Sequence, residues 1–213
     1  MEKAAHKLSE RIAFHLQYHE EKRSVVEYGL LAIFNIIIIG VTISCIGSIF
    51  SIFYECAVIF IGVGILKKST GGAHAETLTG CVIVSVLSIT LFAAVSRYAL
   101  GFPMSIFLNI GMTLAVLLAG VIVFYRSVPV DSPNKPIRKP EKIRRLRRQS
   151  FVLLGLFSAF SVLAAVLAPV YERFYSIAFC IRFILLWQTF MLTTYGNRFI
   201  RFLTKKYDDK EVM

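Results

Sequence analysis

The feature that most constrains this chain is a long apolar run, Val25–Leu66, in which Glu27 and Glu55 are the only charged residues. A helix that crosses the hydrocarbon core of a bilayer needs about 20 apolar residues, so the run is long enough for two such helices. Gly47 and Ser48 lie near its middle and predict the turn between them. The whole chain is 56% hydrophobic and 17% charged, whereas soluble domains are typically about 25% charged. An integral membrane protein is therefore expected.

Four further apolar runs follow, and we expect each of them to cross the membrane once. The predicted fold class is all-α, a polytopic integral membrane protein with six transmembrane helices. The six predicted spans are Val25–Ile46, Ile49–Leu66, Leu78–Tyr98, Met104–Tyr125, Phe151–Pro169 and Phe174–Tyr195. They form one membrane domain over residues 25–195, with short turns expected at Tyr98–Pro103 and Pro169–Arg173.

Residues 1–24 precede these spans and are predicted to form an amphipathic helix that lies in the membrane interface. Leu8, Ile12 and Leu16 recur at helical spacing and share one face, and His19 continues it. Basic side chains that favour lipid headgroups occur along the same segment, namely Lys3, Lys7, Arg11 and Lys22. No secretory signal peptide is visible, because the segment is rich in charge and lacks an early apolar core.

Basic residues are distributed unevenly around the spans. Most of the 24 lysines and arginines lie in four stretches, which are residues 1–24, a loop at 67–81, a basic loop at 126–149 and a tail at 196–213. Since positively charged loops stay in the cytoplasm, both termini and both loops are predicted to be cytoplasmic. The net charge of +11 is then explained by topology and by contact with anionic lipid headgroups. No nucleic-acid partner is expected.

The segment KKSTGGAHAETLTGC, residues 67–81, is the polar stretch that carries chemistry. Two adjacent glycines, Gly71 and Gly72, can adopt positive φ and let other chain segments approach closely. His74 and Cys81 are seven residues apart, which on a continuous helix places them on one face with Cα atoms about 10 Å apart. A neighbouring imidazole can take the proton of a thiol, and the thiolate is a nucleophile. From these residues alone, a catalytic dyad and two incidental side chains both stay open.

The other cysteines carry no comparable signal. Cys45, Cys56 and Cys180 are scattered in apolar runs, where the simplest interpretation is a small buried hydrophobe. The pair His74 and Cys81 does not supply the four ligands of a tetrahedral zinc site. Neither a metal nor another cofactor is expected.

Two motifs together resemble one known family. GGAHAETLTGC, which ends at Cys81, resembles the signature of the accessory gene regulator protein B (AgrB) family, in which GGxHA is followed by a cysteine. VPVDSPNKPI, Val128–Ile137, resembles the cytoplasmic loop signature of the same family. The resemblance covers essentially the whole chain. It implies a cysteine endopeptidase in the cell membrane of a Gram-positive bacterium, which processes a short AgrD-type pro-peptide into a cyclic quorum-sensing signal, a thiolactone or a lactone.

The resemblance also implies roles for individual residues. Cys81 would be the nucleophile and His74 its base. The implied substrate-binding residues are Lys135, Pro136, Lys67, Lys68, Gly71 and Gly72. Many family members carry arginine shortly before the glycine pair, and the lysines of this chain keep the charge but lack the bidentate fork. The expected partners are an AgrD-like pro-peptide and membrane lipids, and both a monomer and a homodimer stay open.

Two alternatives belong to other classes: a small-solute or peptide transporter without covalent chemistry, and a membrane scaffold without enzymatic activity. The transporter hypothesis rests on polar residues inside the spans, namely Asn35, Glu55, Asn109 and Arg182. Glu55 and Arg182 are predicted at matching depths, about 10–12 Å from the outer turns. A structural ion pair between them is the simpler explanation.

Overall fold

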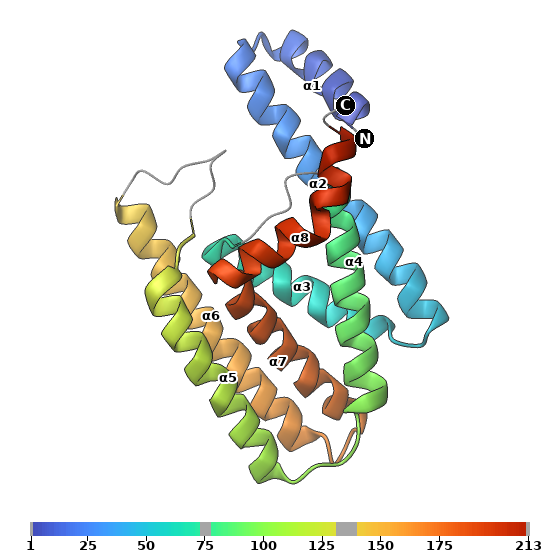
Figure 1. The fold of residues 1–213 in the computed structure, drawn as a ribbon, viewed down its shortest axis with the longest axis vertical. Coiled ribbons are helices and arrows are strands. Elements are labelled where there is room, and N and C mark those ends of the chain that lie inside the picture. The colour runs from blue at the N-terminus through green and yellow to red at the C-terminus, as the bar shows by residue number, and fades with distance from the viewer. Residues whose placement is uncertain (1, 73–77, 131–139, 212–213) are drawn as a thin grey trace. The chain divides into compact units, whose positions relative to one another are not determined.

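The computed structural model of the chain describes residues 2–72, 78–130 and 140–211, and the regular elements in these ranges are all helices (Figure 1). The predicted all-α class is confirmed. In chain order the helices are α1 (Glu2–Leu16), α2 (Glu20–Ile49), α3 (Phe53–Thr70), α4 (Leu78–Ala94), the π-helical turn η1 (Val95–Ala99), α5 (Ile106–Ser127), α6 (Pro140–Leu167), α7 (Arg173–Met191) and α8 (Thr194–Glu211). The chain divides into two compact units, residues 1–42 and residues 43–213.

Five helical stretches in the described part of the chain are long and apolar enough to cross a membrane. They are formed by α2, α4 with η1, α5, α6 and α7, which is the composition of a multi-pass membrane protein. The predicted span Ile49–Leu66 corresponds to α3, whose 18 residues include Glu55, Lys67 and Lys68. Because of these three charges α3 is not among the five, and a sixth crossing remains a prediction.

The N-terminal unit begins with two helices rather than one. α1 ends at Leu16, the next residue, Gln17, has a left-handed φ of 50°, and α2 begins at Glu20. The helix predicted over residues 1–24 is therefore shorter, because residues 20–24 open the first long apolar helix.

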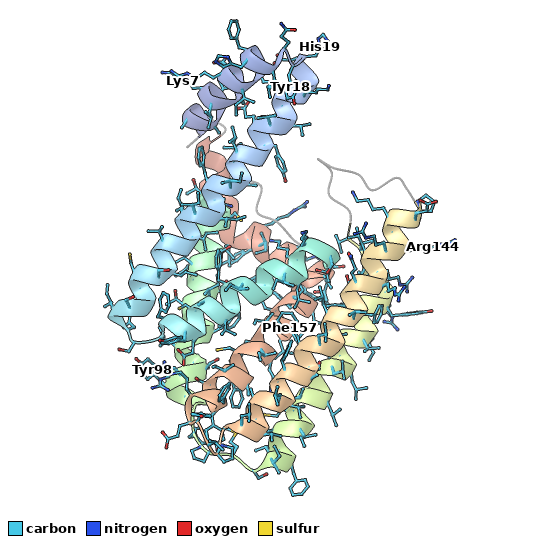
Figure 2. All side chains as sticks on the ribbon, turned by 180° about the vertical axis from the view of Figure 1, so that it is seen from behind. Lys7, Tyr18, His19, Tyr98, Arg144 and Phe157 are labelled. Atoms are coloured by element: carbon cyan, nitrogen blue, oxygen red, sulfur yellow. The ribbon has the colours of Figure 1, made fainter. Side chains whose placement is uncertain are left out.

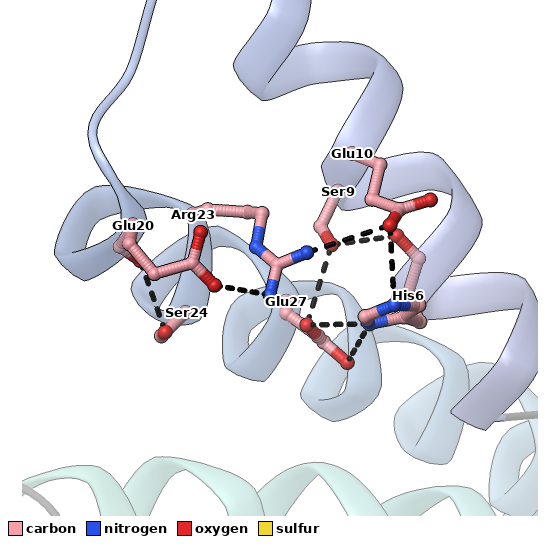
Figure 3. Close-up of polar contacts among 7 residues, drawn as sticks. All are labelled: His6, Ser9, Glu10, Glu20, Arg23, Ser24 and Glu27. Carbon is pink, nitrogen blue, oxygen red and sulfur yellow. Dashed lines mark hydrogen bonds and ion pairs between the residues drawn. The ribbon is translucent and has the colours of Figure 1, made fainter.

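Polar side chains join α1 to the first turns of α2 (Figure 3). The His6 ring lies 3.1 Å from the Glu27 carboxylate, and the Arg23 guanidinium lies 3.5 Å from the Glu10 carboxylate. Phe14 on α1 remains 82% exposed. An exposed aromatic ring on a charged helix suits a membrane interface, and the interfacial position of α1 remains a prediction.

α7 is the central helix of the unit formed by residues 43–213. In its apolar stretch 61% of the residues are buried, against 22–33% in the corresponding stretches of α4, α5 and α6. α3, α5 and α6 all pack against α7 (Figure 1). Gly62 of α3 permits a close approach, because a Cβ there would lie 2.5 Å from Ile184 of α7 and 3.0 Å from Phe157 of α6. Phe157 lies among these helices in Figure 2.

The predicted ion pair between Glu55 and Arg182 does not form. The Glu55 carboxylate accepts a hydrogen bond from the Ser176 hydroxyl of α7 at 2.7 Å. The Arg182 guanidinium donates instead to Asn109 at 2.6 Å and to Thr113 at 3.2 Å, both on α5. The prediction matched the two charges by depth alone. Ser176 and Arg182 are six residues apart on α7, which separates them by about 120° around the helix axis, so that they face different neighbours.

Two stretches predicted without helices are helical in part. The basic loop expected at 126–149 is shorter because α6 begins at Pro140. Proline suits the first position of a helix since its φ is preset, and the glutamate, lysine, arginine and leucine residues that follow are good helix formers. The tail expected at 196–213 forms most of α8.

Candidate active site

Cys81 lies in the first turn of α4, which begins at Leu78. Its thiol is free and partly buried. Cys81 therefore lies where the sequence predicted it, near the start of an apolar helix.

A cavity of about 60 Å³ opens beside Cys81 between α3, α4, α7 and α8. Its lining residues are Ile59, Val63, Lys67, Cys81, Val84, Ser85, Ser88, Ile89, Phe92, Trp187, Gln188, Met191 and Ile200. Typical ligand pockets measure about 300–1,000 Å³. This cavity can therefore accept one side chain or one peptide unit, and a longer substrate must extend beyond it.

Lys67 brings a positive charge to this cavity. It is half-buried in the last turn of α3, where burial lowers the pKa of its ammonium group and the nearby Cys81 opposes that shift. An ammonium group and a thiolate at these positions would stabilise each other. Lys68, the next residue, is exposed and does not line the cavity. The two lysines predicted to bind substrate are thus placed differently, and only Lys67 is beside Cys81.

Gly71 and Gly72 form the turn that follows α3. Their φ angles of 72° and 126° lie in the region that glycine adopts most readily. A Cβ on Gly71 would lie 2.4 Å from the carbonyl oxygen of Val130, and the Val130 N–H donates to the Thr70 carbonyl at 2.9 Å. The turn therefore contacts Val130, the third residue of the predicted loop motif Val128–Ile137. Backbone geometry accounts for both glycines, and their contact with substrate remains a prediction.

Gln188 of α7 holds the same turn from another side. Its amide nitrogen donates to the Thr70 hydroxyl at 2.7 Å and to the Gly71 carbonyl at 2.8 Å. The side chain is 1% exposed and also lines the cavity beside Cys81. Gln188 was not among the residues predicted from the sequence. The available signal was a glutamine within an apolar span, since polar groups are kept in such spans for structural or functional reasons.

Three of the predicted site residues, His74, Lys135 and Pro136, lie outside the described residues. Their predicted roles as base and as substrate contacts stay predictions. Among the described residues, the structure brings Cys81, Lys67 and Gln188 together around one cavity.

The fold and the site together define a class, an all-helical multi-pass membrane protein with a cysteine at a small cavity where an apolar helix begins. A sequence model of the family Accessory gene regulator B matches residues 1–192. The chain belongs to this family. Membership supports a role in the accessory gene regulator system of quorum sensing.

Relatives of the chain come from clostridia. It is 25% identical over 194 residues to a Clostridium perfringens strain 13 protein provisionally named AgrB-like protein 2, covering 89% of this chain and 90% of that protein. It is 27% identical over 196 residues, with the same coverage, to a provisionally named AgrB-like protein of Clostridium perfringens strain SM101. A third such protein, from Clostridium acetobutylicum, is 25% identical over 156 residues, with coverage of 73% and 71%. No solved structure matches the chain significantly.

Proposed function

We propose that the protein is a membrane-embedded cysteine endopeptidase that cleaves the C-terminal tail from a short AgrD-like pro-peptide and promotes cyclisation of the remainder. The observation that carries the proposal is the free Cys81 thiol, which lines a small cavity with the Lys67 ammonium group in a chain of the AgrB family. The product is a thiolactone or lactone peptide that serves as a quorum-sensing signal.

The chemistry proceeds in two acyl transfers. The Cys81 thiol gives its proton to His74, and the sulfur attacks the carbonyl carbon of the scissile peptide bond. The C–N bond breaks, the leaving nitrogen takes the proton from His74, and a thioester joins the retained peptide to Cys81. A thiol or hydroxyl of that peptide then attacks the thioester, closes the ring and returns the Cys81 thiol. The narrow apolar cavity favours ring closure over hydrolysis because it limits the access of water.

The proposed topology has six spans, with α3 as the second, and both termini and the catalytic segment in the cytoplasm. α1 then lies in the membrane interface. Lys135 and Pro136 hold the acidic tail of the pro-peptide, and Lys68, Gly71 and Gly72 line its path. Release of the cleaved tail drives the reaction, because forming a thioester from a peptide bond is uphill.

Substitution of the proposed dyad tests the function. Cys81→Ala and His74→Ala should each abolish cleavage of a co-expressed AgrD-like pro-peptide, whereas Cys45→Ala is the matched control, since Cys45 is an exposed cysteine of α2. Mass spectrometry of the peptide, with membrane levels of each variant compared on an immunoblot, provides the readout. Cleaved peptide from the Cys81→Ala variant would exclude the cysteine-peptidase mechanism.

The substrate contact of Lys135 has its own test. Lys135→Glu should reduce processing severely because it opposes the acidic tail, and a pro-peptide whose tail acids are changed to lysine should recover part of the rate. Arg147→Gln is the control, since Arg147 donates to the Tyr125 carbonyl at 2.8 Å and its guanidinium lies over the Tyr125 ring. Processing by Lys135→Glu at the parental rate would limit the basic loop to a topological role.

A further inference from the structure

A second concave site lies apart from the cavity beside Cys81. It is a groove of about 1050 Å³ between the end of α3 and the first turns of α6. In the part of the chain that the structure describes, five cationic side chains line it, namely Lys68, Lys142, Arg144, Arg145 and Arg148, and no acidic side chain does. In Figure 2, Arg144 projects from the first turns of α6. We call this site the α3–α6 groove.

The cations of the α3–α6 groove lack ion-pair partners among the residues that the structure describes. Arg144 and Arg148 are separated by one helical turn, and like charges at that spacing repel. Lys142 lies in the first turn of α6, where the helix dipole disfavours positive charge. A bound anion would relieve both kinds of repulsion.

The lining of the groove changes along α6. Beyond the arginines it becomes apolar, with Val152 and Leu153 on α6 and Ile65 on α3. Arg144 and Leu153 are nine residues apart, which is about 13 Å along the helix axis. Val152 and Leu153 belong to α6, which is long and apolar enough to cross a membrane. The groove therefore suits a molecule with a charged head and an apolar chain.

We propose that the α3–α6 groove binds an anionic phospholipid, with the phosphate headgroup among the arginines and lysines and an acyl chain along Ile65, Val152 and Leu153. Basic pockets between membrane helices at the cytoplasmic side are known to take such headgroups. Lys68 is separated from Gly71 by only two residues, so a lipid that bridges α3 to α6 also braces the end of α3 that leads into the glycine turn. An acidic peptide would satisfy the cations and leave the apolar wall without a partner.

Paired substitutions of equal charge test the site in the purified full-length protein. The double variant Arg144→Gln/Arg148→Gln removes two cations from the groove. The control Arg126→Gln/Arg147→Gln removes two cations that do not line it, one in the last turn of α5 and one on α6. Native mass spectrometry measures binding of phosphatidylglycerol, with phosphatidylcholine, inorganic phosphate and a poly-glutamate peptide as comparison ligands. We expect the groove pair to lose about tenfold or more in phosphatidylglycerol affinity, and the control pair to bind like the parent. Lys68→Gln, on the opposite wall, should weaken binding in the same direction and serves if the arginine pair fails to fold.

Four results would overturn the proposal. Equal losses in the two pairs would reduce the effect to general surface charge. If phosphatidylcholine bound as tightly as phosphatidylglycerol, the headgroup charge would not be recognised. If inorganic phosphate bound as tightly as phosphatidylglycerol, the acyl chain would not contribute to recognition. Loss of poly-glutamate binding in the groove pair with unchanged phosphatidylglycerol binding would assign the groove to an acidic peptide.

Discussion

Two of the buried polar side chains of α7, Arg182 and Gln188, have surroundings that differ in kind. They are 3% and 1% exposed and six residues apart, which is about 9 Å along the axis. Arg182 donates to side chains of two neighbouring helices, among them Asn109 in the first turn of α5 and Ser161 of α6. Gln188 donates to the end of α3, at a backbone carbonyl and a hydroxyl beside the cavity of Cys81.

The difference shows that burial of a polar group does not by itself reveal its purpose. Arg182 links three helices, so its hydrogen bonds stabilise the bundle. Gln188 fixes the turn at Gly71 and the last turn of α3, so its hydrogen bonds position a chain segment that leads toward Cys81. Loss of the first set should appear mainly in stability, and loss of the second mainly in processing of the pro-peptide.

The largest effect should come from the turn itself. Gly71→Ala places a Cβ 2.4 Å from the Val130 carbonyl oxygen at a φ of 72°, and a non-glycine residue in such a conformation costs about 1–3 kcal/mol even without a clash. We expect processing to fall at least about a hundredfold, which corresponds to about 2.7 kcal/mol. Gly64→Ala is the control, because Gly64 is an exposed glycine of α3 with nothing within 4 Å of its added Cβ. Parental processing by Gly71→Ala would show that the turn geometry is unimportant.

A smaller loss is expected from Gln188→Leu. It removes two hydrogen bonds worth about 1 kcal/mol each, so processing should decrease by about tenfold to thirtyfold while the unfolding temperature changes little. Thr189→Val, at the next position of α7, is the control, since the Thr189 hydroxyl has no hydrogen-bond partner among the described residues. Initial rates with purified protein and pro-peptide measure the effect, and a stability loss without a rate loss would contradict the positioning role.

Asn109→Leu should show the opposite pattern. It removes the oxygen that accepts from the Arg182 guanidinium at 2.6 Å, and hydrogen bonds to charged groups are worth about 1.5–3 kcal/mol. The free energy of unfolding in detergent micelles should fall by that amount, with the rate per folded molecule nearly unchanged. A variant as stable as the parent would show that the hydrogen bond between Arg182 and Asn109 does not stabilise the bundle.

Double-mutant cycles give the finest distinction. Asn109→Leu combined with Arg182→Leu should show a coupling free energy of about 0.5–3 kcal/mol, because the two side chains are in contact. Glu55→Gln combined with Arg182→Leu should be additive within about 0.5 kcal/mol, since Glu55 bonds to Ser176 instead. Strong coupling between Glu55 and Arg182 would instead support the ion pair that the sequence predicts.

Some elements of this fold could be predicted from local sequence, and others could not. Apolar runs marked the helices α2, α4, α5, α6 and α7 because hydrophobic length is a property of one segment. The charges of residues 126–149 predict a loop, whereas α6 already begins at Pro140, because the helix propensity of the residues that follow is high. The glycine pair was correctly expected to adopt positive φ, but nothing in the sequence indicated that Val130 is the segment that approaches it.

By itself, the sequence determined the membrane class, the all-helical fold and the position of Cys81 near a helix start. These depend on composition and on short-range sequence patterns, which do not change with the position of a segment in the tertiary structure. The tertiary structure decided which groups meet: Lys67 with Cys81 at one cavity, Gln188 with the turn at Gly71, and Arg182 with Asn109 rather than Glu55. Depth along a helix can be counted from its end, whereas the direction a side chain faces around the axis is set by the packing of every neighbouring helix.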